Sequence, residues 1–515
     1  MAQTTTKNTP ARAGWLYGPA PDLLFGCGVG YFLTIPILMI VGEAGELAAW
    51  PVTLAAIITM LTAGPHYGAT ILRVLEQRED RYKYAFFFFL VTAGMTVAFL
   101  AGLYHLAIGS WILTLYATWS PWHFAGQNYG LALMFLRRRQ IEIAPKTKRL
   151  FHLSFFLSFL LTAFAIHTEN SVANYAPGTT SAVEAYTVLR LGIPSDVTKY
   201  LAPITAALYL YCLVEVFQQL RAGGARALLP TAALVVTQAT WYTIPALATS
   251  MRGVSMETLL PFTVIWISVA HSVQYLWITS YYAHRANPTR RIAPYVVQAT
   301  LAGSILCVIP WMLFAPGLLG GVPWDAGLAL LVFSVINLHH FLLDGAIWKL
   351  RDGLVARTLL TPGTPKPEVA APRRRMVWPT VWTVGAIGFG ISVFATLESE
   401  FGLRQAETPE QAQQSVNRLK WVGREMMSGH ANIGSRYHQE GRYDEAIEAY
   451  RRSLDLFASA DVWSALGDAE EARGDLNAAL DAQQGALGID PDHEKATTAA
   501  VRLRAKLGLA DPAGR

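Results

Sequence analysis

The sequence predicts an all-α protein in which a polytopic transmembrane helical bundle is followed by a small water-soluble helical-repeat solenoid. Of the 515 residues, 53% are hydrophobic and only 15% are charged, whereas a soluble domain has about a quarter charged residues. The charge deficit is confined to residues 22–397, because residues 398–515 have an ordinary soluble composition. We therefore expect a short cytoplasmic tail over residues 1–21, a transmembrane domain over 22–397 and a soluble domain over 398–515.

Eleven apolar runs are long enough to cross a lipid bilayer. A spanning helix needs about 20 mainly apolar residues, because its backbone must satisfy its own hydrogen bonds in lipid. No small-residue cleavage site follows the first run, so we expect a membrane helix there rather than a signal peptide. The expected spans are 22–42, 48–72, 84–107, 110–136, 150–167, 200–219, 227–249, 257–283, 294–315, 325–348 and 377–397.

The loops between the expected spans alternate in charge. The loops rich in lysine and arginine are 73–83, 137–149, 221–226, 285–291 and 349–375. Since cytoplasmic loops carry the excess of these residues, the amino terminus is expected in the cytoplasm. An odd number of spans then places the soluble domain across the membrane, in the periplasm if this is a bacterial inner membrane. The net charge of +5 comes mostly from these loops, so it does not indicate a nucleic-acid partner.

A repeat with a period of 33 residues runs through residues 431–493. The matched positions are Ile433 with Leu466, Gly434 with Gly467, Gly441 with Gly474, Tyr443 with Leu476, Ala446 with Ala479 and Ser453 with Ala486. The pattern resembles the tetratricopeptide repeat, whose small residues let the two helices of a hairpin approach closely. We expect flanking helices at 408–428 and 494–507. Such a module either binds a protein partner in its concave face or packs on its own membrane domain, and both alternatives remain open.

Five of the 12 histidines lie well inside expected spans: His66, His123, His271, His339 and His340. Ionisable groups in a bilayer core are costly and usually face the interior of the bundle. All five fall on the second, fourth, eighth and tenth spans, which the topology runs in the same direction. A single buried histidine is usually a hydrogen-bonded core residue, so the argument for a site depends on all the spans together.

Each of these spans also carries a polar residue one helical turn after a histidine. Residues four apart lie on the same face of a helix, and the pairs are His66 with Thr70, His123 with Gln127, His271 with Tyr275 and His340 with Asp344. Same-face oxygens can hold the second nitrogen of a metal-bound imidazole. Imidazoles with a carboxylate and no thiolate suit iron, copper or zinc. Since adjacent residues lie about 100° apart on a helix, His339, His340 or both could face the metal.

Three short motifs around these histidines resemble a known family. Pro65-His66-Tyr67-Gly68-Ala69 is similar to a Pro-His-Gly-Ala element, and His123-Phe124-Ala125-Gly126 is similar to a His-Phe-Gly element. His271-Ser272-Val273-Gln274-Tyr275 is similar to His-Ser-x-x-His. These are elements of the Brp/Blh family of membrane β-carotene dioxygenases. The resemblance implies that the three histidines bind a non-haem iron, which cleaves a carotenoid with dioxygen.

The sequence also departs from that family. Thr70 stands where the family has an acid, Gln127-Asn128 replaces another acid, and Tyr275 replaces the second histidine of the last element. The histidine pair with Asp344 has no counterpart in the family. Iron and carotenoid are therefore expectations drawn from a partial match.

The leading hypothesis is an integral-membrane non-haem iron oxygenase that acts on a lipid-soluble substrate. In this hypothesis His66, His123, His271 and His340 bind the metal, and His339 or His340 supplies the ligand that the family motif lacks in this sequence. The residues expected to orient ligands or act in catalysis are Thr70, Gln127, Gln274, Tyr275 and Asp344, with Tyr275 binding metal-bound oxygen. Copper, zinc and haem remain alternatives to iron.

Two other classes of function compete with this hypothesis. One is a transporter whose His/Asp/Gln cluster relays protons or substrate, since intramembrane ionisable residues also mark such paths. The other is a scaffold or assembly factor that recruits a protein partner through its repeat domain. The sequence contains no Walker loop, dinucleotide fingerprint, GxSxG elbow or CxxCH haem-attachment motif.

Overall fold

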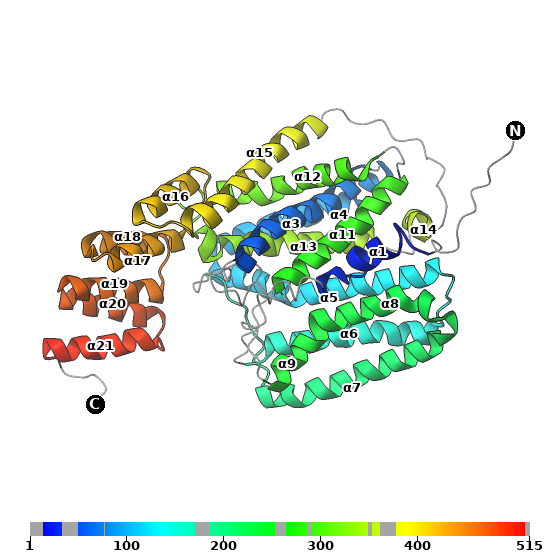
Figure 1. The fold of residues 1–515 in the computed structure, drawn as a ribbon, viewed down its shortest axis with the longest axis horizontal. Helices are drawn as coiled ribbons and strands as arrows, with labels where there is room; N and C mark the ends of the chain where they lie inside the picture. The colour runs from blue at the N-terminus through cyan, green and yellow to red at the C-terminus, as the bar shows by residue number, and fades with distance from the viewer. Residues whose placement is uncertain are drawn as a thin grey trace.

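The computed structural model describes residues 14–32, 50–76, 78–169, 185–252, 264–286, 290–348, 353–360 and 377–509. Over these residues the regular structure is helical, with two isolated β-bridges and no strand. The predicted all-α class is therefore confirmed. Figure 1 shows a bundle of long helices continuing through α15 into a row of shorter helices that ends at the carboxyl terminus.

The membrane domain contains the long helices and several short turns of helix between them. In chain order its elements are α1 (Pro19–Pro21), η2 (Asp22–Gly26), α3 (Trp50–Glu76), α4 (Arg78–Tyr104), α5 (Leu106–Arg138), α6 (Pro145–His167), α7 (Ser195–Leu220), η4 (Arg221–Gly223), α8 (Ala225–Gln238), η5 (Ala239–Thr243), α9 (Ile244–Arg252), α11 (Val264–Ala286), α12 (Ile292–Leu313), η6 (Trp324–Leu328), α13 (Ala329–Ile347), α14 (Gly353–Leu360), α15 (Val377–Leu397) and η7 (Glu398–Leu403).

Six helices among the described residues are long and apolar enough to cross a membrane. They are Tyr84–Tyr104, Pro145–His167, Ser195–Gly223, Ile292–Leu313, Trp324–Ile347 and Trp382–Leu403. Large apolar side chains on their outer faces are exposed, including Phe86 of α4 at 76% and Ile204 of α7 at 66%, as contact with lipid requires. α3, α5 and α11, which carry His66, His123 and His271, are not among the six.

The prediction of a continuous first span over 22–42 is wrong in its described part. The π-helical turn η2 ends at Gly26, and Gly28 has a φ of +74° that interrupts the helix. The carboxylate of Asp22 accepts hydrogen bonds from the backbone N–H groups of Leu16 and Tyr17 and from the indole of Trp277. The segment is therefore folded against α11, and residues 33–42 of the predicted span lie outside the described residues.

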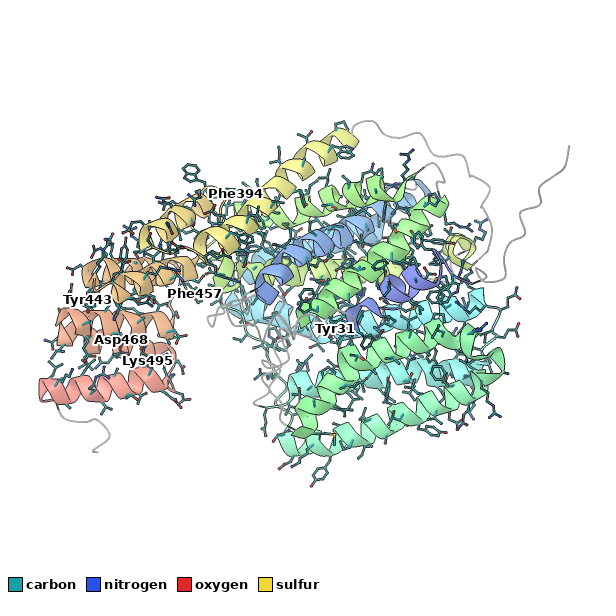
Figure 2. All side chains as sticks on the ribbon, in the orientation of Figure 1. Tyr31, Phe394, Tyr443, Phe457, Asp468 and Lys495 are labelled. Carbon is teal, nitrogen blue, oxygen red and sulfur yellow. The ribbon has the colours of Figure 1, made fainter. Side chains whose placement is uncertain are left out.

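The soluble domain consists of helices stacked in antiparallel pairs. Its elements are α16 (Pro409–Trp421), α17 (Met427–Gln439), α18 (Tyr443–Leu456), α19 (Ala460–Arg473), α20 (Leu476–Ile489) and α21 (Glu494–Leu507). Glycines permit close packing in both pairs: a Cβ at Gly434 would lie 2.7 Å from Tyr450, and one at Gly467 would lie 2.5 Å from Gln483. Asp468 of α19 and Lys495 of α21, labelled in Figure 2, form an ion pair at 2.7 Å that ties the last helix to the second pair.

The predicted helix at 408–428 is two helices in the structure. α16 ends at Trp421, and Gly423 has a φ of +75°, so the chain turns before α17 begins at Met427. A Cβ at Gly423 would lie 3.2 Å from the backbone of Met312, so the turn also brings the chain close to α12. The predicted closing helix at 494–507 coincides with α21.

The soluble domain packs on the membrane domain through its first helices. The carboxylate of Asp325 in η6 accepts the backbone N–H groups of Met427 at 3.1 Å and Ser428 at 2.8 Å, and so caps the amino terminus of α17. The guanidinium of Arg424 lies 4.8 Å from the ring centre of Trp324. Burial lowers the pKa of Arg424 to about 10, while Asp325 acts in the opposite direction. These contacts favour the alternative in which the module packs on its own membrane domain.

The opposite end of the bundle carries the described parts of the basic loops. Arg138 at the end of α5 donates hydrogen bonds to the backbone oxygens of Leu359 in α14 and Trp15. The amino-terminal segment, the loop after α5 and α14 therefore meet at this end. In Figure 1 it lies on the right, away from the soluble domain on the left.

Candidate metal centre

Four packed helices supply the residues of the centre. α3 packs against both α11 and α13, and α13 packs against α5. α3 continues as a helix through Pro65, so the histidine that follows is placed by the helix rather than by a break. α3 and α12 approach closely at Gly68 because glycine has no side chain. A Cβ at this position would lie 1.8 Å from the carbonyl oxygen of Ala299. Small residues at such crossings are typical of membrane helices.

His66, His271 and His340 form a buried group in which one ring nitrogen of each lies within 4.8 Å of the others. Their relative exposures are 3%, 1% and 2%. Nε2 of His66 lies 2.7 Å from Nε2 of His340. Two imidazole nitrogens bound to one ion at about 2.1 Å lie roughly 3 Å apart, so the spacing is close to that of two ligands of one metal.

A second group shares one member with the first. His123, His340 and Asp344 also have ligand atoms within 4.8 Å of one another, and Nε2 of His340 lies 3.4 Å from a carboxylate oxygen of Asp344. The ring of His123 is centred 5.2 Å from that of His271 and 5.1 Å from that of His340. The structure therefore brings four histidines and one carboxylate into one buried cluster.

Two of these histidines have buried ring nitrogens without a hydrogen-bond partner in the described part of the chain. They are both nitrogens of His271 and Nε2 of His123. Leaving a buried polar group unsatisfied costs about 1–3 kcal/mol, and native structures contain few such groups. The ring of His271 stacks on Phe124 at 3.9 Å, so one of its faces is packed, while neither nitrogen has a partner among the described residues. A bound cation fits this arrangement, since it would bind one nitrogen of His271 and Nε2 of His123.

Hydroxyl groups hold the second nitrogens of His66 and His340. Nδ1 of His66 is hydrogen-bonded to Oγ of Ser272 at 3.1 Å, and Nδ1 of His340 to Oγ1 of Thr70 at 2.9 Å. The hydroxyl group of Tyr275 donates its one hydrogen to the carboxylate of Asp344 at 2.7 Å. Thr70 therefore donates to Tyr275 or to Asp344 and accepts from His340. A protonated Nδ1 leaves Nε2 of His340 with the lone pair that a metal ion needs.

Not every predicted residue lies at this cluster. His339 belongs to neither group: its Nε2 is hydrogen-bonded to Thr92 of α4 at 2.9 Å, because it is rotated about 100° from His340 on α13. Gln127 and Gln274 are hydrogen-bonded to each other at 2.6 Å and not to a histidine. Ser272 was not among the residues expected at the centre, although it directly follows His271 in the His-Ser motif.

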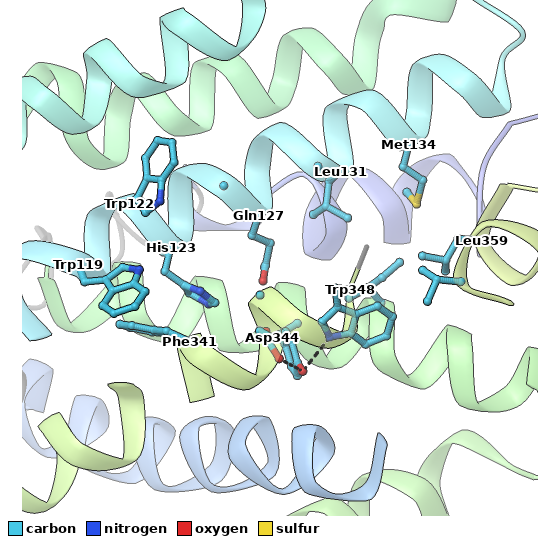
Figure 3. A pocket seen from close by; sticks show the side chains of 16 residues that line it. Trp119, Trp122, His123, Gln127, Leu131, Met134, Phe341, Asp344, Trp348 and Leu359 are labelled. Atoms are coloured by element: carbon cyan, nitrogen blue, oxygen red, sulfur yellow. Dashed lines mark hydrogen bonds between the residues drawn. The ribbon is translucent and has the colours of Figure 1, made fainter. Parts of the chain in front are cut away.

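A pocket of about 360 Å³ adjoins the cluster and is partly open at the protein surface. Figure 3 shows His123, Gln127 and Asp344 on its polar side, with Trp122 and Phe341 among the apolar side chains. A Cβ at Gly126, Gly130 or Gly345 would meet nothing within 4 Å, so these glycines keep the space open. The volume falls within the range of about 300–1,000 Å³ that is typical of small-molecule sites.

Comparisons with known proteins identify the repeat domain and not the membrane domain. No curated protein and no solved structure matches the chain, so the resemblance to membrane β-carotene dioxygenases rests on the three short motifs. The family model of the tetratricopeptide repeat matches residues 432–494. The predicted repeat is therefore confirmed, and the soluble domain contains tetratricopeptide repeats.

Proposed function

We propose that the protein is an integral-membrane, histidine-ligated metalloenzyme: a non-haem iron oxygenase that acts on a lipid-soluble substrate. The observation that carries the proposal is the convergence of His66, His271 and His340, in which both nitrogens of His271 lack a partner among the described residues. Nitrogen ligands with a carboxylate and without thiolate favour iron over a structural zinc site. The adjoining pocket gives an apolar substrate a place beside the cluster.

The side chains of the cluster have separable roles in this proposal. His66, His271, His340 and His123 would hold the metal, and Asp344 would supply a negative charge or a further ligand. Bound iron would supply the redox chemistry and the site for dioxygen that side chains lack. Because Tyr275 donates its hydrogen to Asp344, it would orient that carboxylate, and its expected contact with bound oxygen stays a prediction.

Metal analysis of the protein purified in detergent tests the proposal. We expect about one iron per chain and no Soret band, and we expect His271→Ala to lose the iron. One copper or zinc per chain would support the centre but contradict the oxygenase, and a Soret band would indicate haem instead. Protein without metal would contradict the whole proposal.

The repeat match supports a second role beside the first. Repeats of this kind commonly bind a peptide or a helix of a partner protein, so the domain is a candidate scaffold on the same membrane protein. Affinity purification of the full chain and of a chain ending after η7 tests this role. A protein retained by the full chain alone would support the scaffold, and identical sets would contradict it.

The charge of the two ends supports the orientation that we propose. The described parts of the basic loops lie at the end of the bundle opposite the soluble domain, so under the positive-inside rule the repeats would lie across the membrane from the cytoplasm, in the periplasm if this is a bacterial inner membrane. A reporter enzyme that is active only in the periplasm, fused after α21, should be active. Activity of the same reporter fused after α14 would contradict this orientation.

A further inference from the structure

A chain of hydrogen-bonded side chains leads away from the pocket through the membrane domain. Nε2 of Gln127 donates to Oε1 of Gln274 at 2.6 Å, and Nε2 of Gln274 donates to Oδ1 of Asn128 at 3.1 Å. Nδ2 of Asn128 then donates to Oε1 of Gln238, and Nε2 of Gln238 donates to Oγ of Ser158, both at 3.0 Å. Every amide donates to the next member, so the chain has one direction.

The carbonyl oxygen of Gly26 fixes this direction. Nε2 of Gln274 also donates to that oxygen at 2.8 Å, and a backbone carbonyl can only accept. The amide nitrogen of Gln274 must therefore face Gly26, which leaves its oxygen facing Gln127. Gln127 must meet that oxygen with its own nitrogen, so the carbonyl oxygen of Gln127 takes no part in the chain.

The carbonyl oxygen of Gln127 faces the pocket instead. Figure 3 shows the side chain of Gln127 reaching into the pocket with this oxygen at its end, on the side where Asp344 lies. No hydrogen bond to the oxygen is found among the described residues. Gln127 lies one helical turn after His123, about 6 Å along α5, so the oxygen is an oriented acceptor close to the metal centre.

We infer that Gln127 determines specificity by accepting a hydrogen bond from a hydroxyl group of the ligand, so that the pocket selects an apolar alcohol. The rest of the lining suits a hydrocarbon chain or ring: it includes Trp119, Trp122, Leu131, Met134 and Ile278. A fixed acceptor discriminates because a bound ligand without a donor would cover the oxygen and leave it unpaired. The hydroxyl end of the ligand lies beside the centre, and the apolar part lies along α5.

This inference deepens the proposed function, and its test needs no turnover. The probes are ω-bromododecanol and bromododecane, which share a chain length and a bromine atom and differ in the hydroxyl group. Bromine quenches the fluorescence of tryptophan, and Trp119, Trp122 and Trp348 line the pocket. We expect the native protein, in one detergent, to bind the alcohol about tenfold more tightly than the bromoalkane.

Two matched variants separate the acceptor from the hydrogen-bonded chain. Gln127→Leu should bring the alcohol preference to about one while the affinity for bromododecane is kept, which also shows that the pocket is intact. Gln238→Leu removes an amide from the same chain but not from the pocket, and should keep the preference.

The inference is overturned if Gln127→Leu retains the preference or if both variants lose it equally. Measuring iron in the same samples separates the two proposals. A preference for the alcohol without bound metal would support the alcohol site and contradict the oxygenase. Bound iron without a preference for the alcohol would support the metal centre and contradict the alcohol site.

Discussion

His271 is the histidine of the centre whose two ring nitrogens are both buried without a hydrogen-bond partner among the described residues. His66 and His340 each have a hydroxyl at Nδ1 that leaves Nε2 free for a metal. The centre therefore combines two pre-oriented ligands with one that is held by packing on Phe124. At the scale of residues, metal affinity should depend most on the side chain whose hydroxyl group is hydrogen-bonded to several residues of the centre.

Thr70 is that residue, and Thr70→Val should weaken metal binding about 10- to 100-fold, the range found when a partner of a metal ligand is removed. The variant keeps the shape of the side chain but frees Nδ1 of His340. Thr92→Val is the matched control, because it removes the hydroxyl that contacts His339. Competition with a chelator measures both affinities, and equal affinities in the two variants would contradict the assigned role.

At the scale of elements, glycines decide how near the helices come and where space remains. Gly68 brings α3 against α12, whereas Gly126, Gly130 and Gly345 open onto the pocket. The positions look alike in the sequence, since each is a glycine within an apolar run. Only the packing of neighbouring helices distinguishes a crossing point from a cavity wall.

Gly68→Ala should destabilise the protein by about 1–3 kcal/mol, because overpacking a tight helix contact forces the backbones apart. The movement displaces His66 on α3, so bound iron should fall as well. Gly64→Ala is the control on the same helix, where a Cβ would meet nothing within 4 Å. Thermal unfolding in detergent measures the stability of both variants. An equal loss of stability in the two would show that the close contact between α3 and α12 is not the cause.

Gly130→Leu should fill the pocket and weaken the affinity for bromododecane, measured by tryptophan quenching, at least about tenfold. Iron should stay bound. Gly390→Leu places the same side chain on an exposed glycine of α15 that also has nothing within 4 Å. Unchanged quenching in Gly130→Leu would mean that the probe binds elsewhere.

At the scale of the whole molecule, the sequence predicted the helical class, the repeat and which helices meet, since these depend on hydropathy, periodicity and the i, i+4 spacing. It could not choose between His339 and His340, because the choice depends on how α13 is rotated against α4 and α5. It could not assign Ser272, whose role depends on the register of α11 against α3. It also missed the break at Gly28, where a close contact with Thr237 and a positive φ interrupt the predicted helix.

The junction between the two domains depends on Asp325, so Asp325→Ala should weaken docking by about 0.5–2 kcal/mol, the usual range for the loss of a helix cap. Asp475→Ala is a matched control, because Asp475 caps α20 within the soluble domain. Limited proteolysis between residues 404 and 426 should release the soluble domain faster from the first variant only. Equal rates in the two variants would contradict a docking role.

The central claim is that four membrane helices bring imidazoles to one metal ion, and adjacent residues of α13 test it most directly. His340→Ala and His339→Ala make the same chemical change at neighbouring positions, yet only His340 belongs to the cluster. Iron should be about one per chain in the native protein and in His339→Ala, and absent from His340→Ala. Iron retained by His340→Ala, or lost equally from both variants, would contradict the account.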